Sequence, residues 1–315
     1  MAEHYVPATP KTVAWGYFDA ARKPVLHVKS GDIVTLDTIS GEPADMPPVG
    51  DPRFPLLPEH EAILTENLGD RGMGPHFLTG PVFVEGAMPG MVLQVDIISQ
   101  SLRQPWGWNL IAPLLGTLPE QFPLHRVIHL PIDREAGTFL TPWGKTLPLN
   151  PFFGIIGVAP PAAYGRVATQ QPREYGGNFD NKEFVPGTTI YLPIWNEGAL
   201  FSAGDGHAPQ GDGEVCLTAL EAPLTGSFRL TLRPDMSLKL PRAENDKQLI
   251  TMGFHEDLDT ACRIALSDML DFIVERSGLA RVDAYSLCSL KADMRITQLV
   301  DGNKGAHTVI EKSFL

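Results

Sequence analysis

The segment MVLQVDIIS, from Met91 to Ser99, alternates apolar and polar side chains for most of its length. Alternation with a period of two predicts a β-strand that buries one of its faces. The chain has 30 glycines and 29 prolines among its 315 residues, so turn signals interrupt the apolar stretches often. The first two thirds of the chain are therefore expected to consist mainly of short β-strands joined by shaped loops.

Other apolar stretches that are bounded by turn residues extend this pattern. We expect one hairpin over residues 24–39, with Ser30-Gly31-Asp32 at its turn, and another over residues 138–149. Residues 103–126 contain two tryptophans and several prolines and are expected to form a long loop. The remaining strands are predicted at 82–85, 152–160, 188–195 and 227–234.

Helical periodicity appears only late in the chain. Apolar side chains follow a helical stripe over residues 257–277, and Gly278 is placed to end that helix. A shorter helix is expected over residues 283–292, followed by the strand MRITQLV. We therefore expect a β-rich region over residues 1–225 that carries any site, and a small α+β region over residues 226–315 that completes the fold.

Composition excludes several classes of function. The chain has 37 acidic and 25 basic residues, a net charge of −12, so it repels phosphate and nucleic-acid binding is not expected. It has no stretch of ~20 apolar residues, so no membrane span is expected. The N-terminal residues lack a basic stretch followed by an apolar one, so no signal peptide is expected. The three cysteines are well separated and odd in number, which predicts a reduced, cytoplasmic protein.

The densest group of polar residues is GDGHAPQGDGE, at positions 204–214. Asp205 and His207 are two apart, as are Asp212 and Glu214, so each pair faces one side of an extended chain. If the chain doubles back at the Pro209-Gln210-Gly211 turn, up to three carboxylates and an imidazole converge and require a cation or protons among them. One His among hard oxygens fits zinc or manganese better than calcium, and the spacing is not that of an EF-hand. The alternative is a glycine-rich turn that is simply solvated.

Several segments resemble the acetamidase/formamidase family of amide hydrolases. The matching segments are LTGPVFVEGAMPG (78–90), GGNFD (176–180), GALFSAGDGHAPQGDGEV (198–215) and DAYSLCSLKADMRITQLVDG (283–302). The resemblance implies a mainly β fold with jelly-roll-like and barrel parts, a β-sandwich core, and a small α/β portion with the two late helices. It also implies hydrolysis of short carboxamides to carboxylate and ammonia, a divalent metal site, and a homo-oligomer, for which a dimer is favoured.

The resemblance also assigns roles to individual residues. Glu214 is either a metal ligand or the base that takes a proton from water, and Glu85 is the competing base. His76 and Trp195 stand where this chain departs from the family pattern, so they are candidate substrate-binding residues. Zinc is the expected metal, with manganese or calcium as alternatives. The implied metal ligands are Asp37, Asp180, Asp205, His207 and Glu214.

The expected function is hydrolysis of the C–N bond of an acetamide-like or formamide-like linear amide by a metal-activated water. One alternative is a metal hydrolase of the same scaffold that acts on a cyclic amide, a lactone or a larger amide. Another is a non-catalytic metabolite-binding β-sandwich with a structural ion. A third is a thiol amidase that uses Cys216.

Overall fold

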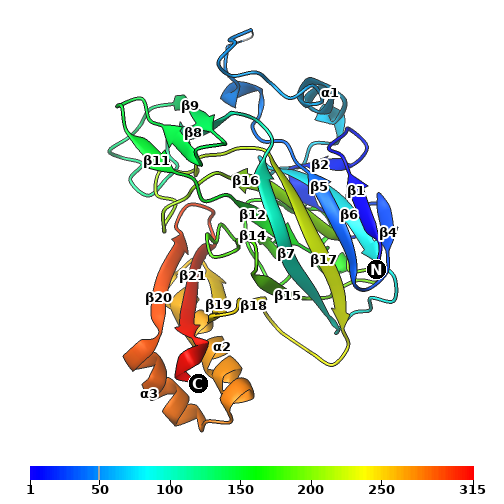
Figure 1. Ribbon diagram of the computed structural model, residues 1–315, viewed down its shortest axis with the longest axis vertical. Coiled ribbons are helices and arrows are strands. Elements are labelled where there is room, and N and C mark those ends of the chain that lie inside the picture. Colours follow the sequence, from blue (N-terminus) through cyan, green and yellow to red (C-terminus); the bar gives the residue numbers. More distant parts are fainter. Residues whose placement is uncertain (49) are drawn as a thin grey trace.

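A computed structural model of the chain describes residues 1–48 and 50–315. It consists mainly of β-sheet, and two large sheets face each other across a common core, so the predicted β-sandwich class is confirmed (Figure 1). None of the described helices is both long and apolar enough to cross a membrane. The α-helices of the described residues are α1 (His60–Glu66), α2 (Leu258–Ser277) and α3 (Arg281–Lys291), and the 3₁₀ turns are η1 (Pro43–Asp45), η2 (Leu68–Asp70), η3 (Ala162–Tyr164) and η4 (Lys312–Phe314).

The larger sheet has nine strands and continues from the sandwich into the C-terminal part of the chain, which lies at the bottom of Figure 1. Its neighbouring strands are antiparallel except for β1 and β5, which are parallel. In spatial order the strands are β1 (Glu3–Val6), β5 (Asp32–Asp37), β17 (Leu224–Arg233), β7 (Val92–Leu102), β15 (Thr189–Pro193), β18 (Arg242–Glu244), β19 (Gln248–His255), β21 (Lys304–Glu311) and β20 (Asp293–Gln298).

The second layer of the sandwich is a six-stranded sheet. In order it contains β14 (Gly176–Asn178), β12 (Phe152–Gly157), β16 (Phe201–His207), β6 (Phe77–Val84) and β2 (Val13–Trp15), with β4 (Leu26–Val28) paired to β6. A four-stranded arm, β8 (Trp106–Ile111), β9 (Arg126–Asp133), β10 (Thr138–Leu140) and β11 (Thr146–Pro148), extends at the upper left of Figure 1. The small pair is β3 (Tyr17–Phe18) with β13 (Val167–Ala168).

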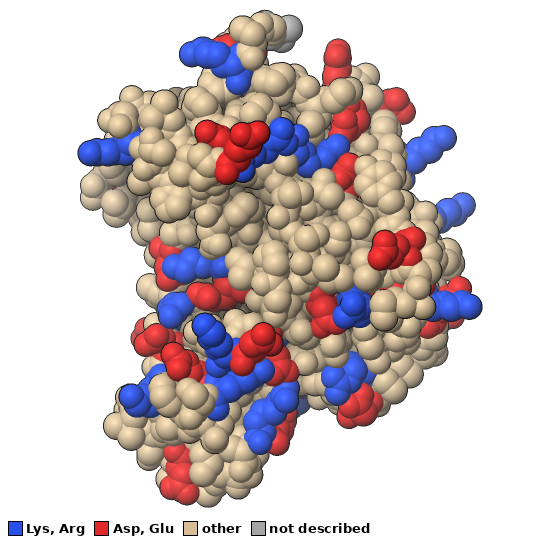
Figure 2. All heavy atoms as spheres, viewed as in Figure 1, with Lys and Arg blue, Asp and Glu red and all other residues tan. Residues whose placement is uncertain are grey.

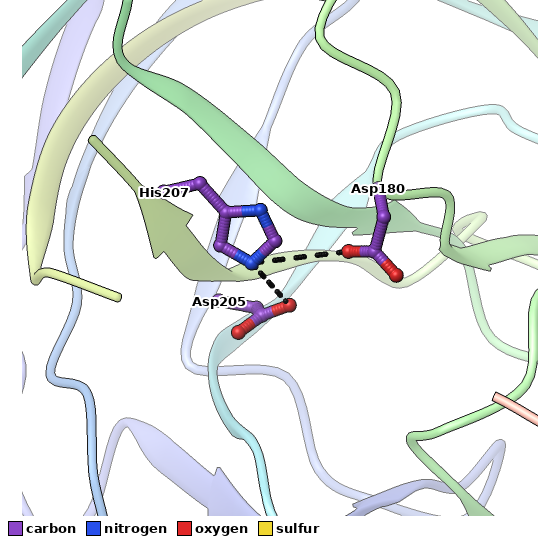
Figure 3. A group of neighbouring side chains, drawn as sticks. All are labelled: Asp180, Asp205 and His207. Atoms are coloured by element: carbon purple, nitrogen blue, oxygen red, sulfur yellow. Dashed lines mark ion pairs between the residues drawn. The ribbon is translucent and has the colours of Figure 1, made fainter. Parts of the chain in front are cut away.

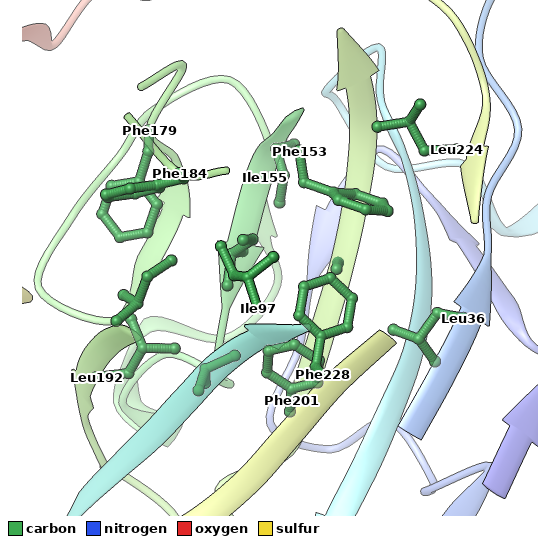
Figure 4. Packing of buried hydrophobic residues seen from close by; sticks show 14 of the residues in the cluster. Leu36, Ile97, Phe153, Ile155, Phe179, Phe184, Leu192, Phe201, Leu224 and Phe228 are labelled. Carbon is green, nitrogen blue, oxygen red and sulfur yellow. The ribbon is translucent and has the colours of Figure 1, made fainter. Parts of the chain in front are cut away.

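Aromatic side chains from both sheets fill the space between them (Figure 4). Phe228 of β17 lies edge-on to Phe153 of β12 and to Phe201 of β16, with ring centroids 5.3 and 5.5 Å apart. Edge-to-face pairs of this kind add stabilisation beyond the area that they bury. These contacts join β12 and β16 to β17 of the larger sheet, and every residue of β16 is buried.

The helix α2 packs on the larger sheet at β19 and β21. It begins after Asp257, whose side chain accepts the backbone N–H of Thr260, and it ends at Gly278 in the left-handed region, as the sequence predicts. Gly253 of β19 allows the close approach, because a Cβ there would lie 2.0 Å from the carbonyl oxygen of Ala261. Acidic and basic side chains stand beside one another over this lower part of the molecule (Figure 2).

Two expectations for local structure are wrong. The strands of the predicted 24–39 hairpin do not pair with each other, because β4 pairs with β6 and β5 pairs with β1 and β17. The region 103–126 is not all loop, because β8 forms within it and pairs with β9. The hairpin over 138–149 is confirmed as β10 and β11. The division expected at residue 225 stays a prediction, and β17 of the continuous larger sheet spans that position.

Replacing Gly253 by Ala is expected to destabilise the fold by pushing α2 away from β19. An overpacked backbone contact of this kind costs about 1–3 kcal/mol in the free energy of unfolding. Urea unfolding followed by far-UV circular dichroism measures this change. The matched control is Gly69→Ala, because Gly69 is exposed and a Cβ there meets nothing within 4 Å. Equal stabilities for the two variants would contradict the packing argument.

Candidate metal centre and active site

The last strand residues of β16 supply the first two members of the site. Asp205 and His207 are two apart on this strand, and the imidazole Nε2 of His207 lies 3.2 Å from a carboxylate oxygen of Asp205. The convergence that the spacing predicts is therefore confirmed. Asp205 adopts a φ of +55°, a left-handed conformation that costs a non-glycine residue about 1–2 kcal/mol.

The tautomer of His207 is set by Gln210. The amide nitrogen of Gln210 donates to the carbonyls of Asp180 (2.8 Å) and Thr297 (3.3 Å), so its amide oxygen faces the imidazole. That oxygen lies 2.8 Å from Nδ1 of His207 and accepts a hydrogen bond from it. Nδ1 therefore carries a proton, and Nε2 is directed toward the carboxylates as a metal-binding nitrogen would be.

Asp180 reaches the same imidazole from the segment after β14 (Figure 3). Its nearer carboxylate oxygen lies 3.9 Å from Nε2 of His207. The carbonyl of Gly154 on β12 accepts the N–H groups of both Phe179 (2.8 Å) and Asp180 (3.2 Å), which turns the chain toward the site. Asp180 is also in the left-handed region, at φ +49°.

Backbone pairing places Glu221 beside His207 in the cluster. Glu221 forms isolated bridges with His207 and with Trp108, and its carboxylate oxygen lies 3.3 Å from Nε2 of His207. The N–H of Ala219 donates to the same carboxylate at 3.0 Å. The chain thus doubles back after β16, as expected, and the return segment contributes an acid of its own.

Glu214 and Asp301 complete the cluster from segments that are hydrogen-bonded to each other. The N–H of Gly213 donates to the carbonyl of Thr297 (3.0 Å), and the N–H of Leu299 donates to the carbonyl of Gly213 (3.1 Å). This attachment places Glu214, at φ +46°, within reach of Asp180 and Asp301. The amide of Asn178 donates to the carboxylate of Asp301 at 3.1 Å.

Burial and mutual repulsion set the protonation of these groups. Burial raises the pKa of Asp180, Glu214 and Glu221 well above the usual values for carboxylic acids, and neighbouring carboxylates raise them further. Burial and the charge of Asp205 raise the pKa of Asp301 to about 7. The cluster cannot hold all of its negative charges without compensation.

Asp205 and His207 behave differently from the rest. Burial alone would raise the pKa of Asp205, but the facing imidazoles of His76 and His207 hold it below its usual range. Burial alone would lower the pKa of His207, but the charge and hydrogen bond of Asp205 raise it to about 9. The site therefore stabilises positive charge between Nε2 of His207 and the carboxylates that surround it.

The residues present fit a divalent cation. Both carboxylate oxygens of Asp180 are buried and accept no hydrogen bond from the described residues, which is costly for a carboxylate without a cation. One imidazole among carboxylates is a donor set that suits zinc or manganese. Three overlapping groups hold their potential ligand atoms within 4.8 Å of one another: Asp180, Asp205 and His207; His207, Glu214 and Glu221; and Asp180, Glu214 and Asp301.

A cavity of about 470 Å³ opens onto this cluster. His76 lines it, with Nε2 3.9 Å from Asp205 and Nδ1 3.1 Å from the hydroxyl of Thr169. Asp205, Glu214, Glu221 and Asp301 line the cavity as well. Cys216 is not among its lining residues, and its sulfur accepts a hydrogen bond from Asn109 in a neighbouring cavity.

Four residues that the sequence analysis singled out lie outside the cluster: Asp37, Glu85, Trp195 and Asp212. The carboxylate of Asp37 is engaged by the hydroxyls of Tyr5 and Thr225 and by Arg103. Glu85 is exposed and lines a different pocket near the N-terminus. Trp195 directs its indole N–H to the carbonyl of Glu174, and Asp212 pairs with Lys182. Asp37, Glu85 and Trp195 thus lie outside the cluster around His207.

Four members of the site were not predicted from the sequence: Asn178, Gln210, Glu221 and Asp301. Asn178 and Asp301 lie inside the segments GGNFD and QLVDG that carry the family resemblance, and Gln210 lies inside the central segment. Only Glu221 lies in a stretch, TALEAPL, that has no motif to single it out.

Known proteins share sequence similarity with the part of the chain that contains most of this cluster. The sequence model of the Acetamidase/Formamidase family matches residues 161–236, which include Asp180, Asp205, His207, Glu214 and Glu221. An acetamidase from Mycolicibacterium smegmatis is 29% identical over 198 residues, 44% of this chain and 49% of that protein. A formamidase from Methylophilus methylotrophus is 30% identical over 191 residues, 44% of this chain and 47% of that protein. The resemblance to the acetamidase/formamidase family is confirmed.

The aligned region spans about half the length of these curated relatives. Among solved structures, a predicted acetamidase/formamidase from Thermoanaerobacter tengcongensis is 27% identical and superposes with a TM-score of 0.85. That match covers 100% of this chain and 98% of the other. The similarity in fold to that protein therefore extends over the length of this chain.

Replacing Gly154 by Ala is expected to disable the site while leaving the sandwich folded. A Cβ at this position would lie 2.5 Å from a carboxylate oxygen of Asp205 and 2.6 Å from one of Asp180, so both ligand candidates must move. We expect the affinity for Zn²⁺, measured by titration calorimetry, to fall at least roughly tenfold, as for lost outer-shell support. Gly211→Ala is the control, because a Cβ there meets nothing within 4 Å. Equal Zn²⁺ affinities for the two variants would contradict this placement.

Proposed function

We propose that this chain hydrolyses the C–N bond of a linear carboxamide to carboxylate and ammonia, with a divalent metal ion at the cluster around His207. The observation that carries the proposal is the buried imidazole whose Nε2 faces Asp180, Asp205 and Glu221, two of which, Asp205 and Glu221, line the cavity. The similarity to acetamidase and formamidase sequences supports the amide as the substrate.

Asp180, Asp205 and His207 are the residues that would hold the ion, and Glu214, Glu221 and Asp301 adjoin them. Zinc is the preferred metal in this proposal because one nitrogen ligand accompanies the carboxylates. When bound, the ion supplies Lewis acidity, which polarises the amide carbonyl and lowers the pKa of water from 15.7 to about 7.

Glu214 is the proposed base. Its carboxylate lines the cavity and takes a proton from the water that attacks the carbonyl carbon. As the C–N bond breaks, the same carboxyl group passes the proton to the leaving amine. Burial raises the pKa of Glu214, which suits a group that must hold a proton between the two transfers. His76 lies where its ring nitrogen can orient the amide beside Asp205.

Replacing Glu214 by Gln is expected to lower kcat by roughly 10²–10⁴-fold, the usual contribution of a general acid–base group. Ammonia release measures turnover, and metal analysis of the same sample separates the roles of base and ligand. Retained metal with lost turnover assigns Glu214 as the base, whereas lost metal assigns it as a ligand. Glu85→Gln is the matched control and should remain near wild type, because Glu85 is exposed and lies outside the cavity. Near-normal turnover of Glu214→Gln would remove Glu214 from both roles.

Removing the metal with a chelator is expected to abolish ammonia release while leaving the far-UV circular dichroism spectrum nearly unchanged. The reason is that the ligand candidates lie on strands and turns that backbone hydrogen bonds already hold. Restoring Zn²⁺ should restore turnover. A large fall in melting temperature, with no amide hydrolysed before or after, would instead identify a structural ion in a binding protein.

The proposal also includes the reduced cytoplasm as the location and a homodimer as the assembly. All three cysteines are free, and large apolar side chains such as Val282, Tyr285 and Leu290 are exposed on α3. Small-amide substrates, not nucleic acid or membrane, are the proposed partners. Light scattering after gel filtration would give the mass of the assembly.

A further inference from the structure

The cavity above the cluster is larger than the smallest amides require. Its volume is about 470 Å³. Acetamide has a single methyl group beside its amide and needs roughly three times the ~30 Å³ that one water molecule occupies in the liquid. A substrate of that size would leave most of the cavity to water. The volume instead lies in the range of ~300–1,000 Å³ that is typical of pockets for larger ligands.

We propose that the substrate is a primary carboxamide with a bulky, uncharged apolar acyl group, such as an arylalkyl group. This inference rests on the proposed amide hydrolysis and names the part of the substrate that the cavity selects. The side chains that form its apolar wall come from β6, β8 and the loops beside them: Ile39, Phe77, Trp108, Leu110, Leu115 and Leu217.

Trp108 places this apolar wall beside the reacting groups. Trp108 and Glu221 are direct antiparallel partners: the N–H of Trp108 donates to the carbonyl of Glu221 (2.9 Å), and the N–H of Glu221 donates to the carbonyl of Trp108 (2.8 Å). Direct partners project their side chains on the same face, with Cβ atoms about 4.5–5.5 Å apart. An amide held at the cluster therefore has its acyl group next to the indole.

The indole is held in this position by its surroundings. Trp108 is 7% exposed, and its ring N–H donates to the hydroxyl of Ser40 at 3.2 Å. Gly41 leaves space for the ring, because a Cβ there would lie 3.1 Å from the indole nitrogen. Leu110, two residues further along β8, lines the same cavity. An apolar surface that is fixed before binding recognises an apolar group with little loss of entropy.

The charges around the cavity argue against an anionic substrate. No Lys or Arg is among the described residues that line it, whereas six acidic residues are: Glu42, Asp45, Asp205, Glu214, Glu221 and Asp301. Glu42 is already paired with Arg71 and accepts the indole N–H of Trp15, and Asp45 accepts the N–H of Glu42. A carboxylate on the acyl group would meet repulsion, while an uncharged aryl group would meet Trp108 and the leucines.

The test compares acetamide, phenylacetamide and succinamate as substrates of the purified, zinc-loaded chain. We expect kcat/KM for phenylacetamide to exceed that for acetamide at least about tenfold, the effect of added apolar contact in a pocket, and succinamate to be the poorest substrate. Leu110→Trp fills the cavity and should lower kcat/KM for phenylacetamide at least about tenfold more than it lowers kcat/KM for acetamide.

The matched control is Leu114→Trp, since Leu114 is 85% exposed and does not line the cavity, and it should keep the preference for phenylacetamide. Leu115→Trp at the mouth is the second filling variant if Leu110→Trp does not fold. Binding to the metal-free chain provides a readout without turnover: phenylacetamide should raise the melting temperature of the wild type but not of the filling variant.

The outcomes separate the two proposals. Turnover of acetamide that equals or exceeds that of phenylacetamide would overturn the proposed substrate class and leave amide hydrolysis standing. A preference for succinamate would overturn it as well. Ammonia release from none of the three amides would overturn both proposals.

Discussion

Repulsion among buried carboxylates around a single imidazole is the constraint that the surrounding structure must satisfy. Asp180, Asp205, Glu214 and Glu221 are each less than a tenth exposed, and Asp301 adjoins them. Charges of one sign at this distance in a medium of low dielectric constant raise one another's energy, unless protons or a cation intervene. The rest of the fold holds these groups together against that repulsion. The cluster therefore favours the binding of protons or a cation.

The backbone contributes to this constraint. Asp180, Asp205 and Glu214 all adopt positive φ angles that non-glycine residues rarely occupy. Conformations of this kind persist only where neighbouring structure over-determines them, and they concentrate at functional sites. Here the neighbouring structure is the pairing of β12 with β16 and the attachment of the 211–214 turn to the end of β20. The two sheets, pinned by the Phe153, Phe201 and Phe228 contacts, provide the rigidity that keeps the strained residues in place.

The sequence predicts those parts of the site that depend on local spacing. Asp205 and His207 are two apart in a strand, so their convergence needs only the strand. Glu221 reaches His207 through backbone pairing with His207 and Trp108, and Asp301 reaches Asp180 and Glu214 through the attachment of Gly213 to Thr297. No local sequence pattern specifies either pairing. The same limit explains the mistaken hairpin, since the turn at Ser30-Gly31-Asp32 leads from one sheet into the other. Asp37 ends its strand as predicted, but its carboxylate is held by Tyr5, Thr225 and Arg103, partners that only the three-dimensional arrangement supplies.

The attachment of Gly213 to the strand end near Thr297 also determines when the acidic cluster is completed. Asp180, Glu214 and Asp301 are separated by long stretches of sequence, so the entropy of closing large loops opposes their meeting until both sheets have formed. During synthesis residue 301 leaves the ribosome after Asp180, Asp205 and His207. An emerging chain therefore lacks Asp301, and the cluster is complete only once β20 and β21 have joined the larger sheet.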